Sequence, residues 1–356
     1  MASVRSETVV EGEEGLYHCI ARCVRRAFLC GKDPYTGRSF EHRKEWVRER
    51  LKFLSSVFAI EVCAYAVMSN HLHAVIRTRP DWAQGWSNEE TARRWLTLFP
   101  PRDENGIALE VTEGMVLAFS LDDQLGDKRT RLGSVSWLMR CLNEAIARRA
   151  NREDGCKGRF WEGRFKCQAL LDDSAVLACM TYVDLNPIRA GMSDSPETSF
   201  FTSARERITA SKFNRGADGA SNKNESPARR PIERLGRNTW ESGPAGWLCP
   251  FGGEGQNSRR GILEITAEDY LSLLDWTGRQ IRDTSGGVVP GHLAPILDRL
   301  DIEQGNWLSL MENYGRLFHR AVGKVGSLRQ AARKAGLRWF QGLGASKSAF
   351  SSLAAD

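Results

Sequence analysis

Hydrophobic positions in the first half of the chain recur at two different spacings. Four short segments are alternating or continuously apolar, which is typical of β-strands. Three longer segments carry apolar residues three and four positions apart, which is typical of amphipathic helices. The predicted strands cover 16–23, 60–68, 71–77 and 165–171, and the predicted helices cover 41–58, 134–150 and 174–186. This order predicts an α+β fold of the ferredoxin-like type, in which helices pack against an antiparallel sheet.

Turn and capping residues mark the ends of several of these elements. Ser69-Asn70 lies between two predicted strands, so we expect a hairpin there. Asp172 or Asp173 can cap the last of the three helices. Pro187 ends that helix, because proline has no amide hydrogen to continue the hydrogen-bond ladder.

The hydrophobic pattern weakens in two places, which suggests how the chain is divided. Residues from about 78 to 133 show little periodicity, and we interpret them as an insertion in a domain that spans 1–208. Residues 209–260 are rich in Ser, Asn, Gly and Pro, which indicates a flexible linker. Helical spacing returns afterwards, so 261–356 is predicted to be a small helical C-terminal region.

Composition excludes several classes of protein. Of the 356 residues, 41% are hydrophobic, which is enough for a core and excludes wholesale disorder. No apolar run approaches the ~18 residues that cross a bilayer, and the polar, acidic N-terminus does not resemble a signal peptide. The nine cysteines fit reduced thiols. We therefore expect a cytoplasmic protein with no membrane partner.

Positive charge is concentrated in one segment. The whole chain has a net charge of +6, yet Lys128–Lys166 holds eleven bases and four acids, a net charge of +7. Such an excess indicates a polyanion site. Bases bind phosphates and aromatic rings stack on unpaired bases, so the mixture suits single-stranded nucleic acid. A solvated helix face followed by a turn is the alternative. The candidate contacts are Arg159, Trp161, Arg164, Phe165 and Lys166, of which Phe165 can equally be a core residue. Arg189 is a further base that could equally lie on the surface.

His71 and His73 are candidate metal ligands. Side chains two positions apart on a strand point to the same face, so both imidazoles can reach one metal ion while Leu72 faces the core. Two histidines leave positions for water and a phosphate oxygen, as a catalytic site requires. A His-x-His pair alone is more often two surface or packed histidines.

Tyr182 and Asn186 form a second candidate group. They are four residues apart, so on a helix they share a face, and Asn186 can offer an oxygen ligand beside the tyrosine hydroxyl. Tyrosine can form a covalent intermediate, although its ordinary pKa of about 10 makes it a weak nucleophile. The alternative is a half-buried helix aromatic with no chemical role.

Four motifs occur in order along the first half of the chain. They are Tyr17-His18, Met68-Ser-Asn-His-Leu-His73, Gly163-Arg-Phe-Lys166 and Tyr182-Val-Asp-Leu-Asn-Pro-Ile-Arg-Ala-Gly191. Together they resemble the single-tyrosine HUH transposases, particularly the REP-associated tyrosine transposases of bacteria, over residues 15–192. The stretch 78–133 is longer than in compact members of that family, and the chain after residue 197 has no counterpart in the smallest ones.

The resemblance implies a fold, a reaction and a set of roles. It implies a ferredoxin-like nuclease domain that cleaves single-stranded DNA, with hairpin DNA as the expected partner. Tyr182 matches the nucleophile that forms a 5′-phosphotyrosine, and rejoining to another 3′-hydroxyl reverses the step. His71 and His73 match the ligands of a divalent ion, Mg²⁺ or Mn²⁺, and Asn186 stands at the third ligand position. It also implies a bacterial protein that lies at the nucleoid when bound to DNA, and leaves monomer and homodimer open.

Other interpretations remain open from the residues. The chain could be a domesticated regulator that binds DNA without chemistry, or an RNA-binding module on the same fold. His18 can approach the site or pack at the sheet edge, of which we favour packing, and Asn70 can orient a ligand or only form the turn. Residues 327–339 carry bases and no acids, which fits either a second DNA contact or an amphipathic surface helix.

Overall fold

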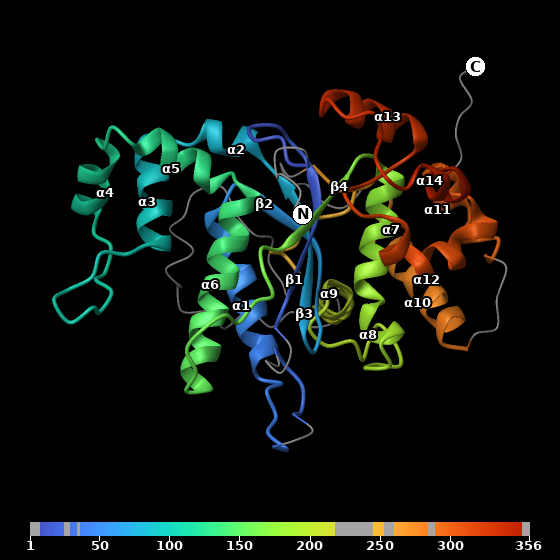
Figure 1. Cartoon of the computed structure of the whole chain (residues 1–356), viewed down its shortest axis with the longest axis horizontal. Coiled ribbons are helices and arrows are strands. Elements are labelled where there is room, and N and C mark those ends of the chain that lie inside the picture. Colours follow the sequence, from blue (N-terminus) through green and yellow to red (C-terminus); the bar gives the residue numbers. More distant parts are fainter. Residues whose placement is uncertain are drawn as a thin grey trace.

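A mixed five-stranded sheet lies at the centre of the molecule (Figure 1). The computed structural model describes residues 8–24, 29–33, 36–217, 245–252, 260–283 and 289–350. The strands are β1 (Leu16–Arg22), β2 (Ile60–Val67), β3 (His71–Thr78), β4 (Lys166–Leu170) and β5 (Ala321–Val322), in the order β2-β3-β1-β4-β5. The first four pair antiparallel, and β5 joins β4 in parallel. The predicted α+β class is confirmed, whereas the parallel edge strand from late in the chain was not predicted.

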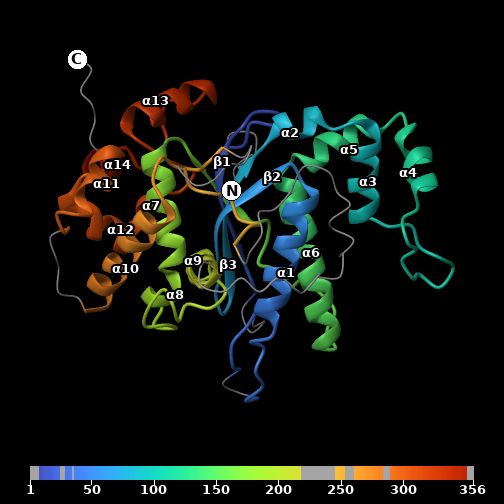
Figure 2. The same cartoon turned by 180° about the vertical axis from the view of Figure 1, so that it is seen from behind.

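Helices cover both faces of the sheet (Figures 1 and 2). Helices α1 (Arg43–Val57) and α6 (Val135–Glu153) cover one face, and α7 (Asp173–Asp184) covers the other. Strand β3 divides its side chains between the two layers. Leu72, Ala74 and Ile76 belong to the core under α1 and α6, while Val75 belongs to the core under α7. Leu72 therefore faces the core as the strand alternation predicts.

Helix α7 begins where its sequence predicts, but it ends two residues before the predicted end at 186, so Pro187 is not the residue that ends it. The Asp172 side chain accepts a hydrogen bond from the Ala175 amide and caps the first turn. The helix ends at Asp184, and Pro187 lies in the first turn of the short helix α8 (Asn186–Arg189), where its missing amide hydrogen breaks no bond. Although α7 is apolar on nearly every side, no helix in the described parts of the chain is long and apolar enough to cross a membrane.

The insertion after β3 is helical. It contains α2 (Pro80–Gly85), α3 (Asn88–Leu98), α4 (Glu113–Ser120) and α5 (Leu125–Leu132), which project from one side of the molecule (Figure 1). Ala92, Leu96, Val116 and Leu125 form a small core of their own. Each helix is only two or three turns long, so the apolar spacing was too short to recognise in the sequence.

The C-terminal helices lie on the α7 side of the sheet, and α12 packs directly against α7 (Figure 1). They are α10 (Ala267–Asp283), α11 (Ala294–Arg299), α12 (Trp307–Leu317), α13 (Val325–Lys334) and α14 (Leu343–Ala349), with a short 3₁₀ helix at Gln304–Asn306. Trp307 and Tyr314 of α12 lie in the same hydrophobic core as Val176 and Cys179 of α7. The predicted helical C-terminal region therefore shares its core with the sheet domain.

The predicted linker differs from the structure at both of its described ends. Helix α9 (Ser203–Ala217) extends into it, and Trp247, Leu248, Cys249 and Phe251 are buried. Leu248 forms a parallel β-bridge with Val62, which adds this segment to the edge of β2. Residues 218–244 and 253–259, which complete the predicted linker, lie outside the described residues.

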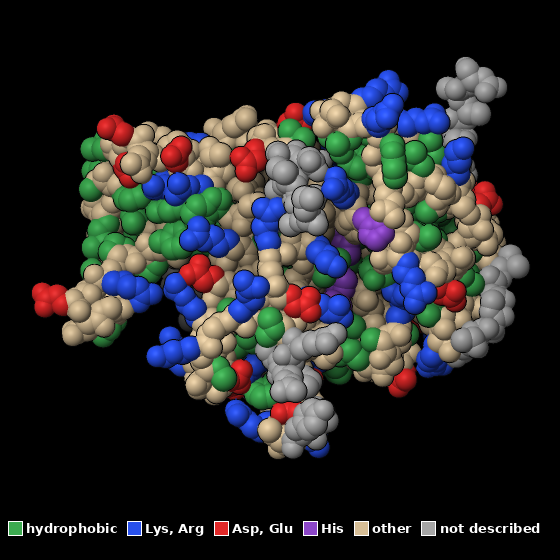
Figure 3. Space-filling model, in the orientation of Figure 1, with side chains coloured by type: hydrophobic (Ala, Val, Ile, Leu, Met, Phe, Trp, Pro, Cys, Tyr) green, Lys and Arg blue, Asp and Glu red, His purple; other side chains and the backbone are tan. Residues whose placement is uncertain are grey.

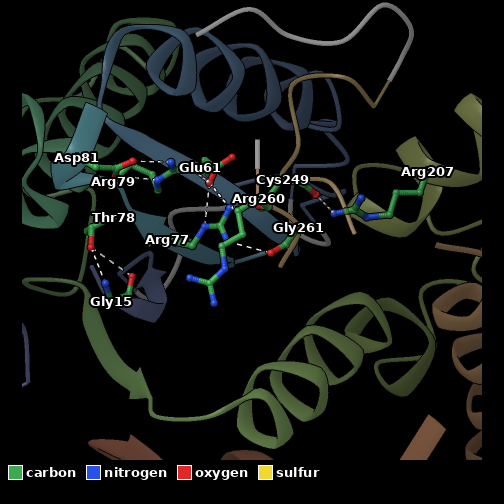
Figure 4. Close-up of polar contacts among 10 residues, drawn as sticks. All are labelled: Gly15, Glu61, Arg77, Thr78, Arg79, Asp81, Arg207, Cys249, Arg260 and Gly261. Carbon is green, nitrogen blue, oxygen red and sulfur yellow. Dashed lines mark hydrogen bonds and ion pairs between the residues drawn. The ribbon is translucent and has the colours of Figure 1, made fainter. Parts of the chain in front are cut away.

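Buried arginines connect α9 and the segments around Cys249 and Gly261 to the sheet by hydrogen bonds (Figure 4). The Arg207 guanidinium donates to the carbonyl oxygens of Cys63 and Cys249 at 2.9 and 3.0 Å. Arg77 donates to the carbonyl oxygen of Gly261 at 3.2 Å and to the Glu61 carboxylate at 2.8 Å. Glu61 is 1% exposed, so its charge and that of Arg77 are compensated inside the protein.

Candidate active site

Two histidines and a tyrosine meet where α7 crosses β3. His71 and His73 point from β3 toward the layer that contains α7, as the two-residue alternation predicts. The ring of Tyr182, near the end of α7, lies with its centroid 6.0 Å from that of His73 and nearly perpendicular to it. The centroids of His71 and His73 are 4.8 Å apart. The structure thus brings together the three side chains that carry the predicted chemistry.

These side chains line a pocket of about 310 Å³ between the sheet and the C-terminal helices. Histidine side chains lie in and beside this hollow, with lysine and arginine side chains around it (Figure 3). The strands provide one wall and α12 with the residues after it provides another. The lining residues are His18, Ile20, Arg22, His71, His73, Glu162, Gly163, Arg164, Lys166, Gln168, Tyr182, Tyr314, Gly315, Phe318 and His319.

Burial disfavours the charged form of three histidines of the pocket, His18, His71 and His73. Burial, followed by the positive charge of Arg22, lowers the pKa of His71 to about 4. Burial, with the neighbouring histidines, holds the pKa of His73 well below its ordinary value. Burial likewise lowers the pKa of His18 to about 4. Neutral imidazoles keep a nitrogen lone pair, which is the form that binds a metal ion.

The Tyr182 ring is held between two other side chains. Its centroid lies 4.6 Å from that of Tyr314 in a stacked arrangement, and the Arg189 guanidinium lies 4.7 Å from the ring centroid. Arg189 also donates to the Glu312 carbonyl oxygen of α12 at 2.7 Å. Gly315 follows Tyr314 and leaves room for the Tyr182 hydroxyl, because a Cβ at this position would lie only 2.8 Å from that oxygen. Helix α12 therefore sets the position of the phenol.

Asn186 has a different contact from the one its spacing suggested. Its side-chain nitrogen donates to the Tyr182 carbonyl oxygen at 3.0 Å, and the residue is buried. Asn186 is outside the set of residues that line the pocket. Its side-chain oxygen is not used in that bond, so the third-ligand role stays a prediction.

The basic candidates fall into two groups. Arg164 and Lys166 are exposed and line the pocket beside the histidines. Arg159 is exposed outside it and donates to the Glu162 carbonyl oxygen, while Arg189 contacts Tyr182 from the side of α8. Arg22, which the sequence did not single out, also lines the pocket. The predicted phosphate contacts are thus placed beside the tyrosine only in part.

The two aromatic candidates are core residues in this structure. Trp161 and Phe165 are only 8% and 7% exposed and belong to the hydrophobic core under α1 and α6. The Trp161 indole donates to the Asn143 carbonyl oxygen at 2.8 Å, which fixes the ring against α6. The burial of Trp161 contradicts its expected role as a stacking platform, whereas for Phe165 a core position was the equal alternative. The sequence alone does not reveal whether an aromatic side chain among basic residues points into the core or toward solvent.

Three pocket residues were missed or misjudged. His18 approaches the site rather than packing away from it, because its Nε2 lies 2.8 Å from Nδ1 of His73. Gln168 stands opposite His18 on β4 and lines the same pocket. The alternation of β1 and β4 could have placed both on the histidine face. Tyr314 carried no local signal, since only the tertiary packing of α12 brings it to Tyr182.

Asn70 contacts His71, which fits the first of its two alternatives, the orientation of a ligand. Its side-chain oxygen lies 2.7 Å from Nδ1 of His71. An amide oxygen only accepts, so His71 donates from Nδ1 and its Nε2 keeps the lone pair. The orientation of a ligating histidine through its second nitrogen is a common feature of metal sites.

The donor set fits a divalent ion. Nε2 of His73 is buried and has no hydrogen-bond partner among the described residues, although it lies in a pocket with His71. A buried acceptor without a partner is unfavourable unless something binds it. In the parts of the chain that the structure describes, no group of three or more His, Cys, Asp or Glu side chains is arranged to hold a metal. The remaining ligands would therefore be amide, water or phosphate oxygens, consistent with an open site.

The basic segment near the C-terminus is an amphipathic surface helix. Leu328 and Ala332 of α13 are buried in a small core with Phe340, while Arg329 and Arg333 are exposed. This is one of the two interpretations of residues 327–339. A DNA contact by the exposed face stays a prediction.

Comparisons with known proteins give one structural likeness. No family model matches the chain, and no curated protein matches it. Among solved structures, a REP-associated tyrosine transposase bound to a REP hairpin is similar over 65% of this chain and 98% of that chain, with 14% identity and a TM-score of 0.35. At this TM-score the likeness carries no argument about the chain, so function must be argued from the pocket itself.

Proposed function

We propose that this protein is a metal-dependent single-stranded DNA endonuclease and strand transferase, a transposase that uses Tyr182 as its nucleophile. The observation that carries the proposal is the meeting of Tyr182 with His71 and His73 in one basic pocket. A phenol, two neutral imidazoles and flanking bases are the groups that a phosphodiester substrate requires. Within the four motifs that resemble single-tyrosine HUH transposases, these are also the residues at the functional positions.

The reaction exchanges one phosphate ester for another. The Tyr182 oxygen attacks the phosphorus of a DNA phosphodiester, an O–P bond forms, and the bond from phosphorus to the 3′-oxygen breaks. The phenol proton passes to solvent, and the departing 3′-oxygen takes up a proton. The products are a 5′-phosphotyrosine and a free 3′-hydroxyl, and attack by another 3′-hydroxyl reverses the step. One ester replaces another, so no external energy source is required.

The residues of the pocket have separable tasks in this reaction. Tyr314 and Arg189 hold the Tyr182 ring so that few orientations of the phenol are available, which reduces the entropy lost on reaching the reactive geometry. Arg164 and Lys166 bind phosphates of the strand that enters the pocket. His71, His73 and the Asn186 oxygen would hold Mg²⁺ or Mn²⁺. When bound, the ion supplies positive charge that polarises the phosphate and stabilises the charge that develops on it.

The strand order supports the ferredoxin-like core that the sequence predicts. Strands β4, β1, β3 and β2 are adjacent in that order and antiparallel, with α1 between β1 and β2 in the chain and α6 before β4. This is the β-α-β-β-α-β arrangement, interrupted by the helical insertion. Hairpin DNA as substrate and a site at the bacterial nucleoid are proposed on the resemblance of the motifs alone.

A covalent-adduct assay tests the proposal. Single-stranded hairpin DNA from the flanks of the gene is labelled at its 3′ end, so that the label stays with the 5′-phosphotyrosine product. It is incubated with the full chain and Mn²⁺ or Mg²⁺, with and without EDTA, and separated on a denaturing protein gel. We expect a labelled band at the mass of the protein that disappears with EDTA and in Tyr182→Phe. DNA binding on native gels should survive in that variant, because only the hydroxyl is removed.

Tyr314→Phe is the matched control. Tyr314 lies in the same pocket, with its ring centroid 4.6 Å from that of Tyr182. The substitution removes the hydroxyl of Tyr314, and this variant should still form the adduct. An adduct that persists in Tyr182→Phe and is lost in Tyr314→Phe would identify Tyr314 as the nucleophile and contradict the proposal. A gel shift with no adduct in any form of the protein would favour the DNA-binding regulator without chemistry.

A further inference from the structure

A chain of hydrogen bonds runs from the C-terminal region to His73. The Gln168 side-chain nitrogen donates to the Phe318 carbonyl oxygen at 2.7 Å. The Gln168 side-chain oxygen lies 2.8 Å from Nδ1 of His18. Nε2 of His18 lies 2.8 Å from Nδ1 of His73. All three side chains are buried, with exposures of 1% for His18, 3% for His73 and 6% for Gln168, so water cannot substitute for these partners.

The direction of every bond follows from the first one. A backbone carbonyl only accepts, so Gln168 must present its nitrogen to Phe318 and its oxygen to His18. That oxygen also only accepts, so Nδ1 of His18 carries a hydrogen. Among the described residues no carboxylate is hydrogen-bonded to His18 or His73. An uncompensated buried imidazolium is strongly unfavourable, so we take both rings as neutral. Nε2 of His18 is then an acceptor, and Nδ1 of His73 must be the donor.

The series of hydrogen bonds ends at Nε2 of His73, a ring nitrogen with no hydrogen in the pocket. With its hydrogen on Nδ1, His73 has a lone pair on Nε2, and this atom is buried without a hydrogen-bond partner among the described residues. His71 reaches the same tautomer by a separate route, through the Asn70 side-chain oxygen. Two independent partners thus expose the same nitrogen of both histidines in one pocket.

We propose that His18 and Gln168 are positioning residues that hold His73 in its Nδ1-protonated tautomer, so that its Nε2 is prepared to bind a divalent ion. The tautomer follows from the hydrogen bonds alone, whereas the identity of the acceptor as a metal rests on the proposed function. The Phe318 carbonyl sets the direction of the chain. A carbonyl oxygen of the C-terminal region therefore determines which ring nitrogen of His73, on the central sheet, carries the hydrogen.

The experiment reads the tautomer and the metal separately. Full-length protein labelled with ¹⁵N-histidine is studied by long-range ¹H–¹⁵N correlation, which shows which ring nitrogen carries the hydrogen. Mn²⁺ alone is then titrated by calorimetry. We expect His73 Nε2 to be unprotonated in the wild type. In His18→Leu we expect a mixture of His73 tautomers and an affinity for Mn²⁺ that is about 10- to 100-fold weaker.

Three further variants keep the test sharp. His18→Gln offers an acceptor oxygen to Nδ1 of His73 and should restore both the tautomer and most of the affinity. Gln168→Met removes the amide but keeps the length of the side chain, and it should mix the His73 tautomers if His18→Leu does not fold. Ile20→Val, on the same face of β1 and in the same pocket, should change neither readout.

The two proposals fail in different ways. A protonated His73 Nε2 in the wild type, or an unchanged tautomer in both His18→Leu and Gln168→Met, would overturn the positioning role. Unchanged Mn²⁺ affinity in a His18→Leu variant with mixed tautomers would overturn it as well. Wild-type protein with the expected tautomer and no Mn²⁺ binding would support the positioning role and contradict the metal site of the proposed function.

Discussion

Replacing Gly315 with alanine would test whether α12 sets the position of the nucleophile. A Cβ at this position would lie 2.8 Å from the Tyr182 hydroxyl oxygen and 3.5 Å from its Cζ atom. Ordinary van der Waals contact begins at 3.4 Å, so the hydroxyl must move by about 0.6 Å. The ring has little freedom to absorb this shift elsewhere, because Tyr314 stacks on it and Arg189 lies against it.

The substitution should lower the rate of adduct formation while leaving the free energy of unfolding nearly unchanged. A misplacement of about 1 Å can reduce the rate of a catalysed step by about 100-fold, so a shift of about 0.6 Å predicts a loss of roughly ten-fold. Alanine is favoured over glycine in a helix by about 0.5–1 kcal/mol. This gain offsets the strain of the new contact, so we expect the free energy of unfolding to change by less than about 1 kcal/mol.

The assay compares the rate of adduct formation under single-turnover conditions with the free energy of unfolding in urea. Gly326→Ala is the matched control, since Gly326 also lies in a helix and an added Cβ there would meet nothing within 4 Å. It should keep the wild-type rate. A Gly315→Ala protein that forms the adduct at the wild-type rate would refute the view that α12 positions Tyr182.

Three predictions concern the fold. Glu61→Ala should lower the free energy of unfolding by about 3–5 kcal/mol, because it leaves buried arginines without their carboxylate. Asp81→Ala, at a side chain that is 55% exposed, should lower it by at most about 1 kcal/mol. Equal losses of the two variants in urea denaturation would contradict this. Burial raises the pKa of Glu153, but its hydrogen bond and ion pair with buried Arg43 outweigh this and hold that pKa below the usual 4.5. The Glu153 carboxylate therefore contributes stability above pH 4.5 that is lost as the pH falls through the lowered pKa; Glu153→Gln should lose about 1–3 kcal/mol at pH 7 and less on acidification, and an unchanged pH dependence of urea unfolding would argue against the pair. Trp307→Ala should lower the free energy of unfolding by about 3–5 kcal/mol. It should lower the melting temperature of the whole chain in a single transition, because the core around Trp307 is shared with α7. A separate transition at lower temperature in calorimetry would contradict the shared core.

Local pattern was sufficient for the elements whose faces differ. The alternation in β3 placed Leu72 in the core and both His71 and His73 on the opposite face, and the helical spacing placed Tyr182 on α7. Both inferences succeed because strand and helix periodicity fix where a side chain points without knowledge of its partner. The same spacing placed Asn186 on the helix of Tyr182, but α7 ends at Asp184 and Asn186 begins α8.

The remaining features depend on contacts between distant segments. Leu248 is buried because it pairs with Val62, yet its surroundings in the sequence have the composition of a linker. Tyr314 reaches the site only because α12 packs on α7. Phe165 lies between Arg164 and Lys166, as an aromatic of a binding loop would, and only its burial in the core under α1 and α6 distinguishes its role. Composition and periodicity carry no information about such pairings.

The wall that α12 adds to the pocket has a consequence for protein synthesis. Tyr182, His71 and His73 are all made before the residues that enclose them, Tyr314 and Phe318. At roughly 5–20 residues per second, the ~140 residues that separate Tyr182 from the far wall take about 7 to 27 s to emerge. During that interval the nascent chain carries Tyr182 in an incomplete pocket. A ribosome that stalls or terminates early would therefore release a product that lacks one wall of this pocket, so the order of translation itself delays the completion of the site.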